Sequence, residues 1–398
     1  MTSRERVLLA LNHKEADRVS IYDAPWIPTL KRWHDEGFPS GISAAEYFDY
    51  DIVRFSADTS PRFPIEIVEE SEEYIVITTP FGGLRREHKD YSTTPQILDY
   101  PCKSPRDWPK IKERLVAEWS RVDWQGEWEV DLTGSKVTLR KGKCSDRTVP
   151  TTGGRPDWGR GLRRCREAHD EGKFICYTAA VGYDKIQNYV ATERLLMAVA
   201  TEPEWVRDMY ETDAKLVVEM YRIMKERGFE FDGAWLSCDL GYRNGLFFSP
   251  YHFKEQLRPT FKYLFDYFKD DGLPVILHSD GYVQDLVPYF IADGLTCLQP
   301  LETKAGMDLL ELKKNFGHKL AFMGGIDVRS MADLNPSIIE DEIKKKLLFA
   351  KKGGGYIYCC DADSVPENVS FDRYCQVIEL VKKYGSYRGI LGGRFKPI

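Results

Sequence analysis

The run Leu273-Pro-Val-Ile-Leu-His278, followed directly by Ser279-Asp-Gly281, contains the pattern that decides the fold. Its apolar part has the length of one buried strand, and the polar turn after it leads into a segment with helical spacing of apolar residues. The same unit recurs from residue 174 onward. The other strand-like runs are 174–181, 231–238, 295–299, 319–323 and 355–360.

Strand and helix units that repeat, with strands that are almost wholly apolar, indicate a parallel sheet covered by helices. Long helical stretches are expected over about 190–227 and from 250 to about 270. Because no glycine-rich dinucleotide fingerprint follows any of these strands, a closed (β/α)8 TIM barrel is favoured over an open doubly wound sheet. No break in composition divides the regular part, about 171–388, so we predict a single domain over 1–398.

The N-terminal part, about 1–170, is less regular. Residues 3–12 predict a short amphipathic helix, and a proline in Asp23-Ala-Pro-Trp26 predicts a loop. Residues 74–79 and 128–140 have the alternation of β-hairpins, the second around Thr133-Gly-Ser. We therefore expect an N-terminal extension and β-hairpin insertions outside the regular barrel.

Charge and cysteine content exclude some classes of partner. Lys and Arg total 56 against 62 Asp and Glu, a net charge of -6, so the chain has no basic field to hold a nucleic-acid backbone. The start, MTSRERVLLALNHKE, has no apolar run long enough for a signal peptide or a membrane span. Nine cysteines without a tight spacing pattern favour reduced thiols. A cytoplasmic enzyme with neither nucleic acid nor membrane as partner is expected.

Function in such a barrel collects at the carboxyl ends of the strands. His278 and Asp280, one residue apart just past an apolar run, could reach one ion, and zinc accepts imidazole, carboxylate and thiolate ligands. The alternative is that His278 bonds a nearby carbonyl and that Asp280 caps the next helix. Convergence of several polar strand ends favours the first interpretation. The predicted metal ligands are His278 and Asp280, with Cys360 or Asp361 completing the set.

The last strand-like run ends in Cys359-Cys360-Asp361-Ala-Asp363. Adjacent residues on a strand point to opposite faces, so at most one of the two cysteines is expected to face the site. Asp361 and Asp363 are alternative oxygen ligands or general acids. Asp239, after another strand, could also simply bond nearby amides. The predicted catalytic residues are Asp239, His278 and Asp361.

Aromatic residues are numerous, with 22 Tyr and 20 Phe, and most are expected to serve in packing. Some near the strand ends could instead line a pocket for a flat substrate. The predicted substrate-binding residues are Asp23, Trp26, Tyr242, Asn244 and Tyr356.

Several segments together resemble the uroporphyrinogen decarboxylase superfamily, which also contains corrinoid-dependent methyltransferases. They are the start over residues 2–19, Asp239-Leu-Gly-Tyr-Arg-Asn-Gly with Ser249-Pro250, His278-Ser-Asp-Gly, Phe322-Met-Gly-Gly-Ile-Asp327, and Gly354-Gly-Tyr-Ile with Ser364-Val-Pro-Glu-Asn-Val. The resemblance covers nearly the whole chain and is weakest around 120–150. It implies a (β/α)8 barrel, in agreement with the periodicity.

The resemblance also separates branches of the superfamily. The decarboxylase branch has an arginine-rich segment after its first strand, whereas this chain has an acid and a tryptophan in Tyr22-Asp-Ala-Pro-Trp26, which disfavours a tetrapyrrole substrate. The methyltransferase branch has a His-x-Cys zinc motif and a later cysteine. Here His278 matches, Asp280 replaces the cysteine, and the later position falls near Ala362. Harder ligands than thiolates favour a reaction other than thiol activation.

The resemblance therefore implies a methyltransferase that takes a methyl group from a methoxylated aromatic compound and transfers it to the Co(I) corrinoid of a partner protein. The chain itself lacks a corrinoid-binding segment of the Asp-x-His-x-x-Gly type. The resemblance further suggests zinc as cofactor and a homodimer. The alternatives are a cofactor-independent decarboxylase, a zinc enzyme that moves methyl from a corrinoid protein to a thiol or folate, and a barrel that has lost catalysis and serves in assembly.

Overall fold

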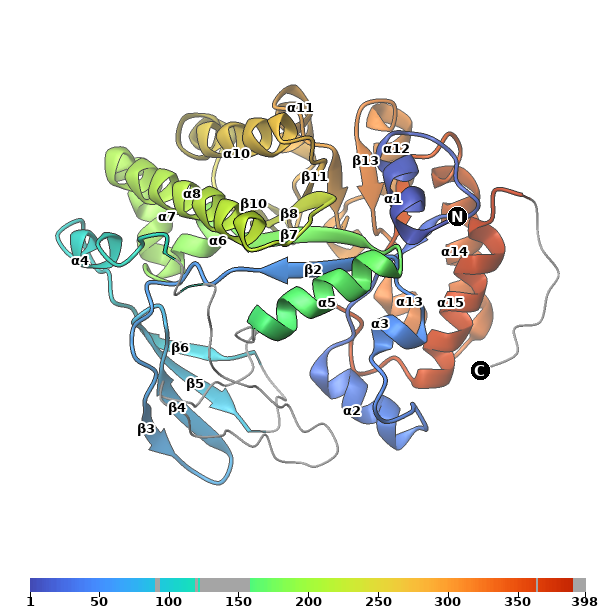
Figure 1. The fold of residues 1–398 in the computed structure, drawn as a ribbon, viewed down its shortest axis with the longest axis horizontal. Helices are drawn as coiled ribbons and strands as arrows, with labels where there is room; N and C mark the ends of the chain where they lie inside the picture. The colour runs from blue at the N-terminus through green and yellow to red at the C-terminus, as the bar shows by residue number, and fades with distance from the viewer. Residues whose placement is uncertain (90–93, 119–120, 122–157, 363, 389–398) are drawn as a thin grey trace.

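The computed structural model describes residues 1–89, 94–118, 121, 158–362 and 364–388 (Figure 1). Its main sheet has eight strands in the order β1-β14-β13-β12-β11-β8-β7-β2, and the ladders between these neighbours are parallel. From β2 onward the spatial order follows the chain, and β1 comes last, as in a TIM barrel. The strands are β1 (Ser20–Ile21), β2 (Ile52–Ser56), β7 (Phe174–Ala180), β8 (Gly233–Ser237), β11 (Val275–His278), β12 (Cys297–Gln299), β13 (Ala321–Met323) and β14 (Tyr356–Tyr358).

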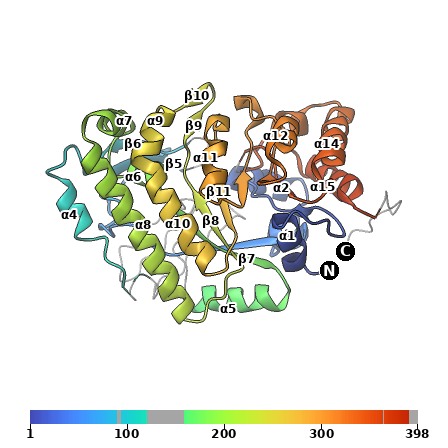
Figure 2. The same ribbon diagram turned by 90° about the horizontal axis from the view of Figure 1, so that it is seen from above.

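Helices surround this sheet, and the apolar strands between them form one continuous core (Figures 1 and 2). The strand residues of β8, β11 and β12 are almost all buried, because parallel strands in a barrel are covered on both faces. The main helices are α1 (Ser3–Leu11), α5 (Trp158–Asp170), α7 (Thr192–Thr201), α8 (Pro203–Glu226), α10 (Arg258–Asp270), α11 (Val287–Ala292), α12 (Leu309–Phe316), α14 (Pro336–Ala350) and α15 (Phe371–Gly385). Shorter ones are α2 (Ile27–Asp35), α3 (Ala44–Tyr47), α4 (Trp108–Lys112), α6 (Gly182–Ile186), α9 (Pro250–His252) and α13 (Val328–Ala332). The predicted TIM barrel is confirmed.

The two long helical stretches are both present, with interruptions. Pro203 begins α8 and separates it from α7, because proline has no N–H to continue the preceding helix. The second stretch runs from α9 through a π-helical turn, η2 (Phe253–Leu257), into α10. In Figure 2 α8 and α10 lie side by side, as do α14 and α15.

An antiparallel sheet of four strands lies to one side of the barrel (Figure 1). Its strands are β3 (Ile67–Glu70), β4 (Tyr74–Thr78), β5 (Leu84–His88) and β6 (Gln96–Asp99). The hairpin expected at 74–79 is the β4–β5 pair, whereas the one expected at 128–140 lies outside the described residues. Barrel strand β2 falls within the part that the sequence marks as irregular, because Arg54 interrupts its apolar run.

The barrel closes between β1 and β2 through Asp51, the residue before β2. The Asp51 N–H donates to the Ile21 carbonyl (2.7 Å), and the Ile21 N–H donates to the Asp51 carboxylate (2.6 Å). In this pair of hydrogen bonds, the Asp51 carboxylate accepts in the place where a backbone carbonyl would accept in a regular strand pair. The carboxylate therefore joins the first strand of the barrel to the second.

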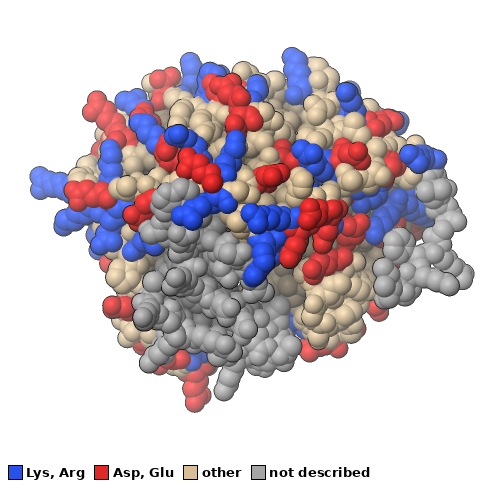
Figure 3. Space-filling model, viewed as in Figure 1, with Lys and Arg blue, Asp and Glu red and all other residues tan. Residues whose placement is uncertain are grey.

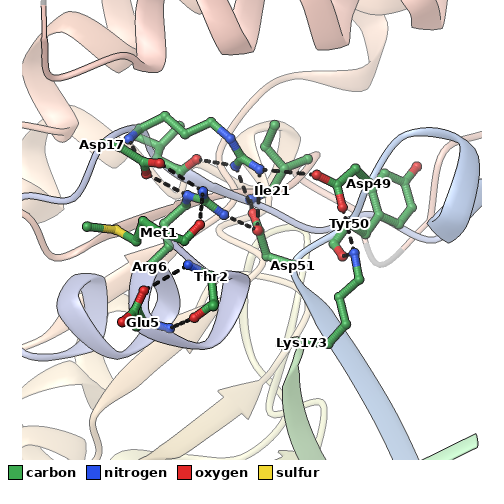
Figure 4. Close-up of polar contacts among 12 residues, drawn as sticks. Met1, Thr2, Glu5, Arg6, Asp17, Ile21, Asp49, Tyr50, Asp51 and Lys173 are labelled. Atoms are coloured by element: carbon green, nitrogen blue, oxygen red, sulfur yellow. Dashed lines mark hydrogen bonds and ion pairs between the residues drawn. The ribbon is translucent and has the colours of Figure 1, made fainter. Parts of the chain in front are cut away.

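Two arginines stabilise the buried Asp51 carboxylate (Figure 4). Arg6, from α1, donates to it at 2.6 Å, and Arg18 donates at 2.8 and 3.3 Å. Hydrogen bonds between ionised groups are short and stronger than neutral ones. Because Arg6 belongs to α1, the same carboxylate also fixes the N-terminal helix against the barrel.

Charged groups elsewhere on the surface are mixed in sign. On the face seen in Figure 3, Lys and Arg side chains are interspersed with Asp and Glu.

Within the described part of the chain, every helix is too short or too polar to cross a bilayer.

The Asp51→Asn substitution should lower the free energy of unfolding by about 3–5 kcal/mol, because it leaves two arginines beside a neutral amide in a buried position. Urea unfolding followed by circular dichroism measures this. Asp49→Asn is the matched control: Asp49 bonds Lys173 at 2.6 Å but its side chain is 62% exposed, so less than about 1 kcal/mol should be lost. Equal losses in both variants would contradict the role given to Asp51.

Asp17 should make the stability depend on pH below about 4. Burial acts to raise its pKa, but hydrogen bonds from Arg6 at 2.7 and 2.9 Å and the nearby charges lower that pKa to about 2. The folded-state pKa lies below that of the unfolded chain, about 4, so this stabilisation is complete above pH 4 and lost as the pH falls toward 2. In Asp17→Asn, the free energy of unfolding should therefore decline less between pH 4 and 2, by on the order of 1 kcal/mol. This value is smaller than the pKa shift alone would give, because solvent screens a side chain that is 27% exposed. Urea unfolding at a series of pH values would test this, and unchanged slopes would refute it.

Candidate active site

Three polar side chains gather where β8 and β11 end. His278 is the last residue of β11 and pairs with Ser237, the last residue of β8, so the two strands stop at the same level. Asp239 and Asp280 each lie two residues beyond these ends. Potential ligand atoms of Asp239, His278 and Asp280 all lie within 4.8 Å of one another. We refer to these three residues as the histidine group.

The two loops that carry the carboxylates are bonded to each other. The Asp280 N–H donates to Asp239 Oδ1 (2.9 Å), and the Leu240 N–H donates to Ser279 Oγ (3.0 Å). Gly281 has a φ of 79°, and a Cβ there would lie 2.2 Å from the carbonyl carbon of Gly241. Only glycine permits this approach, which holds the two aspartates at a fixed separation.

Gln299, at the end of β12, sets the tautomer of His278. The Nδ1 of His278 lies 2.6 Å from Gln299 Oε1, and the Gln299 side chain is fully buried. An amide oxygen only accepts hydrogen bonds, so Nδ1 carries the proton. When the ring is neutral, its Nε2 presents a lone pair on the side where Asp239 Oδ1 lies, 3.5 Å away. This is the tautomer that a metal ligand or a general base requires.

Asp184 belongs to the same region and was not predicted from the sequence. It lies in α6, just after β7, and Gln187 donates to its carboxylate at 2.5 Å. Burial and the neighbouring carboxylate of Asp239 raise the pKa of Asp184 to about 7, although His278 acts in the opposite direction. The signal was available: Val181-Gly-Tyr-Asp184 follows an apolar strand, as the other candidate acids do.

The structure divides the predicted metal set. Cys360 does not lie with His278 and Asp280. Its sulfur lies near the sulfur of Cys359 and the carboxylate of Asp23, and the ligand atoms of these three residues are also within 4.8 Å of one another. The expectation that the two cysteines face opposite ways is wrong as well. It assumed a continuous strand, but β14 ends at Tyr358, so both residues follow the strand and both sulfurs face Asp23. We call Asp23, Cys359 and Cys360 the thiol group.

Asp361 is bound by backbone amides. Its carboxylate oxygens accept from the Thr303 N–H and the Val328 N–H, each at 3.0 Å, and burial raises its pKa. It therefore holds together the loops that follow β12 and β13, and it is not a member of the histidine group. The alternative acid, Asp363, lies outside the described residues.

The predicted substrate-binding residues are dispersed. Trp26 is exposed at the start of α2, and Tyr242 and Asn244 are exposed in the hairpin of β9 (Gly241–Tyr242) and β10 (Gly245–Leu246) beyond β8. Asp23 is buried in the thiol group, where burial raises its pKa to about 6. Tyr356 is buried within β14, and its hydroxyl donates to the Gly324 carbonyl (2.9 Å), which is a packing role.

The fold and these strand ends define an α/β TIM-barrel protein whose candidate centre combines imidazole and carboxylates. Residues 188–384 match the family of uroporphyrinogen decarboxylase (URO-D), which confirms the predicted resemblance over the part that carries β8 to β14 and the histidine group. The comparison with curated proteins gives no significant match.

Solved structures agree with the fold. A methyltransferase from Methanosarcina mazei superposes with a TM-score of 0.63 over 96% of this chain and 99% of its own, at 12% identity. A B12-independent methionine synthase from Shewanella sp. W3-18-1 in complex with selenomethionine is far less similar, with a TM-score of 0.30, 13% identity, and 55% and 64% of the two chains covered. Only the first similarity is high enough to bear on the architecture.

Gln299→Leu should release the His278 tautomer, because no acceptor would remain at that position for the Nδ1 proton. Nitrogen-15 NMR of labelled protein should show one His278 tautomer, with the proton on Nδ1, in the wild type and a mixture in the variant; His278→Ala assigns the signal. The matched control is Gln256→Leu, a buried glutamine in η2. The same fixed tautomer in Gln299→Leu would show that another group sets it.

Proposed function

We propose that this protein is a methyltransferase that takes the methyl group of a methoxylated aromatic compound and passes it to the Co(I) corrinoid of a partner protein. The URO-D family match and the overall likeness to the Methanosarcina mazei methyltransferase support methyl transfer in general. The histidine group is the observation that carries the finer proposal, because its donors are one imidazole and two carboxylates.

The histidine group fits a zinc ion. Zinc accepts imidazole and carboxylate ligands, and a catalytic site uses three protein ligands with a fourth position for substrate. The spacing of the three donors and the His278 tautomer meet these requirements. Asp239, His278 and Asp280 would hold the ion, which would supply a Lewis acid for the oxygen of the methyl donor. None of these three side chains contains sulfur, whereas enzymes that activate a thiol favour thiolate ligands for their zinc. The ligand set therefore favours an ether over a thiol as the substrate.

The remaining residues must stabilise the oxygen that leaves when the methyl group is transferred. Methyl transfer to Co(I) breaks the bond between the methyl carbon and the ether oxygen and leaves the electron pair on the oxygen. A phenolate is a poor leaving group unless its charge is stabilised or it receives a proton in the transition state. Asp184 is suited to hold that proton on its carboxyl group, because its burial raises its pKa and favours the protonated form. We propose it in place of Asp361, one of the general acids considered from the sequence.

His278→Ala should reduce methyl transfer from a methoxylated phenol to Co(I) corrinoid by at least about 100-fold, the range expected when a ligand or general base is removed. Loss of the Co(I) absorption as methyl-Co(III) forms provides the rate, and circular dichroism checks the fold. The exposed His318 provides the matched control, His318→Ala, which should keep wild-type turnover. Unchanged turnover in His278→Ala would exclude a chemical role for this residue.

Two further assays separate the competing functions. Carbon dioxide release from an aromatic acid without corrinoid would identify a decarboxylase, and methyl transfer that depends on a thiol or folate would identify the reverse direction of transfer. Either result would overturn the proposal.

A further inference from the structure

The thiol group plays no part in the proposed reaction, yet it collects three metal-binding side chains in one buried place. Strands β1 and β14 pair as Ser20 with Ile357 and Ile21 with Tyr358, and the Tyr22 N–H donates to the Tyr358 carbonyl (3.0 Å). The residues that come next on each strand therefore lie beside each other. These are Asp23 on one side and Cys359 and Cys360 on the other.

The separations within the thiol group suit a four-coordinate ion. The Asp23 Oδ1 lies 3.0 Å from Cys360 Sγ and 3.9 Å from Cys359 Sγ. Ligands bound to tetrahedral zinc at about 2.0–2.3 Å are roughly 3.3–3.8 Å apart, so shifts of a few tenths of an ångström would suffice.

The buried Asp23 carboxylate has no cationic partner among the described residues. Its partners in the described structure are the two thiols, the Tyr374 hydroxyl at 3.0 Å, the Ala24 N–H at 3.2 Å and the Cys360 N–H, and none of these is positively charged. A buried carboxylate normally has a paired charge or a metal. Two sulfurs with one carboxylate form a soft donor set, which selects zinc-like ions over magnesium or calcium.

Groups around the ligands hold them in place, as is usual for metal sites. Tyr374, which donates to Asp23, also bonds the Tyr50 hydroxyl at 2.7 Å. The Gln299 side-chain amide N–H lies 3.8 Å from Cys359 Sγ. The sulfur and the carboxylate are thus each oriented by a neighbour that is itself buried.

We propose that Asp23, Cys359 and Cys360 form a second metal site, specific for a thiophilic divalent ion such as zinc and separate from the histidine group. Binding replaces the thiol protons, and two thiolates with one carboxylate coordinate the ion. This site exists whether or not the protein transfers methyl groups.

Cobalt(II) titration of the metal-free full-length protein tests the proposal, because cobalt bound to thiolate has a charge-transfer absorption that cobalt bound to imidazole and carboxylate lacks. The wild type should show this absorption, and Cys359→Ser/Cys360→Ser should lose it together with one equivalent of bound cobalt. Added zinc should displace the cobalt and abolish this absorption. Cys375→Ser is the matched control, because Cys375 lies in α15 outside both groups, and it should keep the signal.

Two further variants keep the test decisive if the double variant does not fold. Asp23→Asn retains both sulfurs, so the absorption should remain while the affinity for cobalt falls at least about tenfold. His278→Ala should keep the thiolate absorption in full. Absence of the absorption in the wild type, its persistence without both cysteines, unchanged affinity in Asp23→Asn, or its loss in His278→Ala would each overturn a separate thiolate site.

Discussion

Barrel closure depends on one buried carboxylate. Asp51 bonds the Ile21 amide and both Arg6 and Arg18, and it does so at the junction between the first two strands of the barrel. Desolvating an acid is costly, and the two guanidinium groups offset that cost through short charge-assisted bonds. Both the thiol group, which follows β1, and the hairpin-bearing rim beyond β8 take their positions from a sheet that this interaction completes.

The architecture of the regular part of the chain, from β7 onward, could be predicted from the sequence, because its six main-sheet strands are short apolar runs that end in polar turns. Strand β2 was not, since Arg54 interrupts its pattern. That arginine is accommodated over the rings of Trp235 and Tyr22, at 4.7 and 5.3 Å from their centroids. Such a contact links strands that are distant in sequence, and local periodicity contains no information about it.

The candidate site was accessible to a similar extent. His278, Asp280 and Asp239 were all predicted as site residues from their positions after strands, and the structure brings the three together. The separation of Cys360 from this group was not foreseeable, because it depends on where β14 ends and on which strand lies next to it. Asp184 was overlooked because an acid in the first turn of a helix ordinarily stabilises the helix. Its altered acidity comes from burial and from Asp239, and both are tertiary effects.

Gln299 connects the two groups through opposite ends of one amide: its oxygen engages His278, and its nitrogen engages Cys359. The amide cannot rotate to improve one contact without breaking the other. Alkylation of the Cys359 sulfur, or metal coordination by it, would change the strength of its hydrogen bond with the Gln299 amide. That change would in turn alter the hydrogen bond between the Gln299 oxygen and His278, and thereby the basicity of the imidazole. Chemistry at one strand end would then be felt at another without any movement of the backbone.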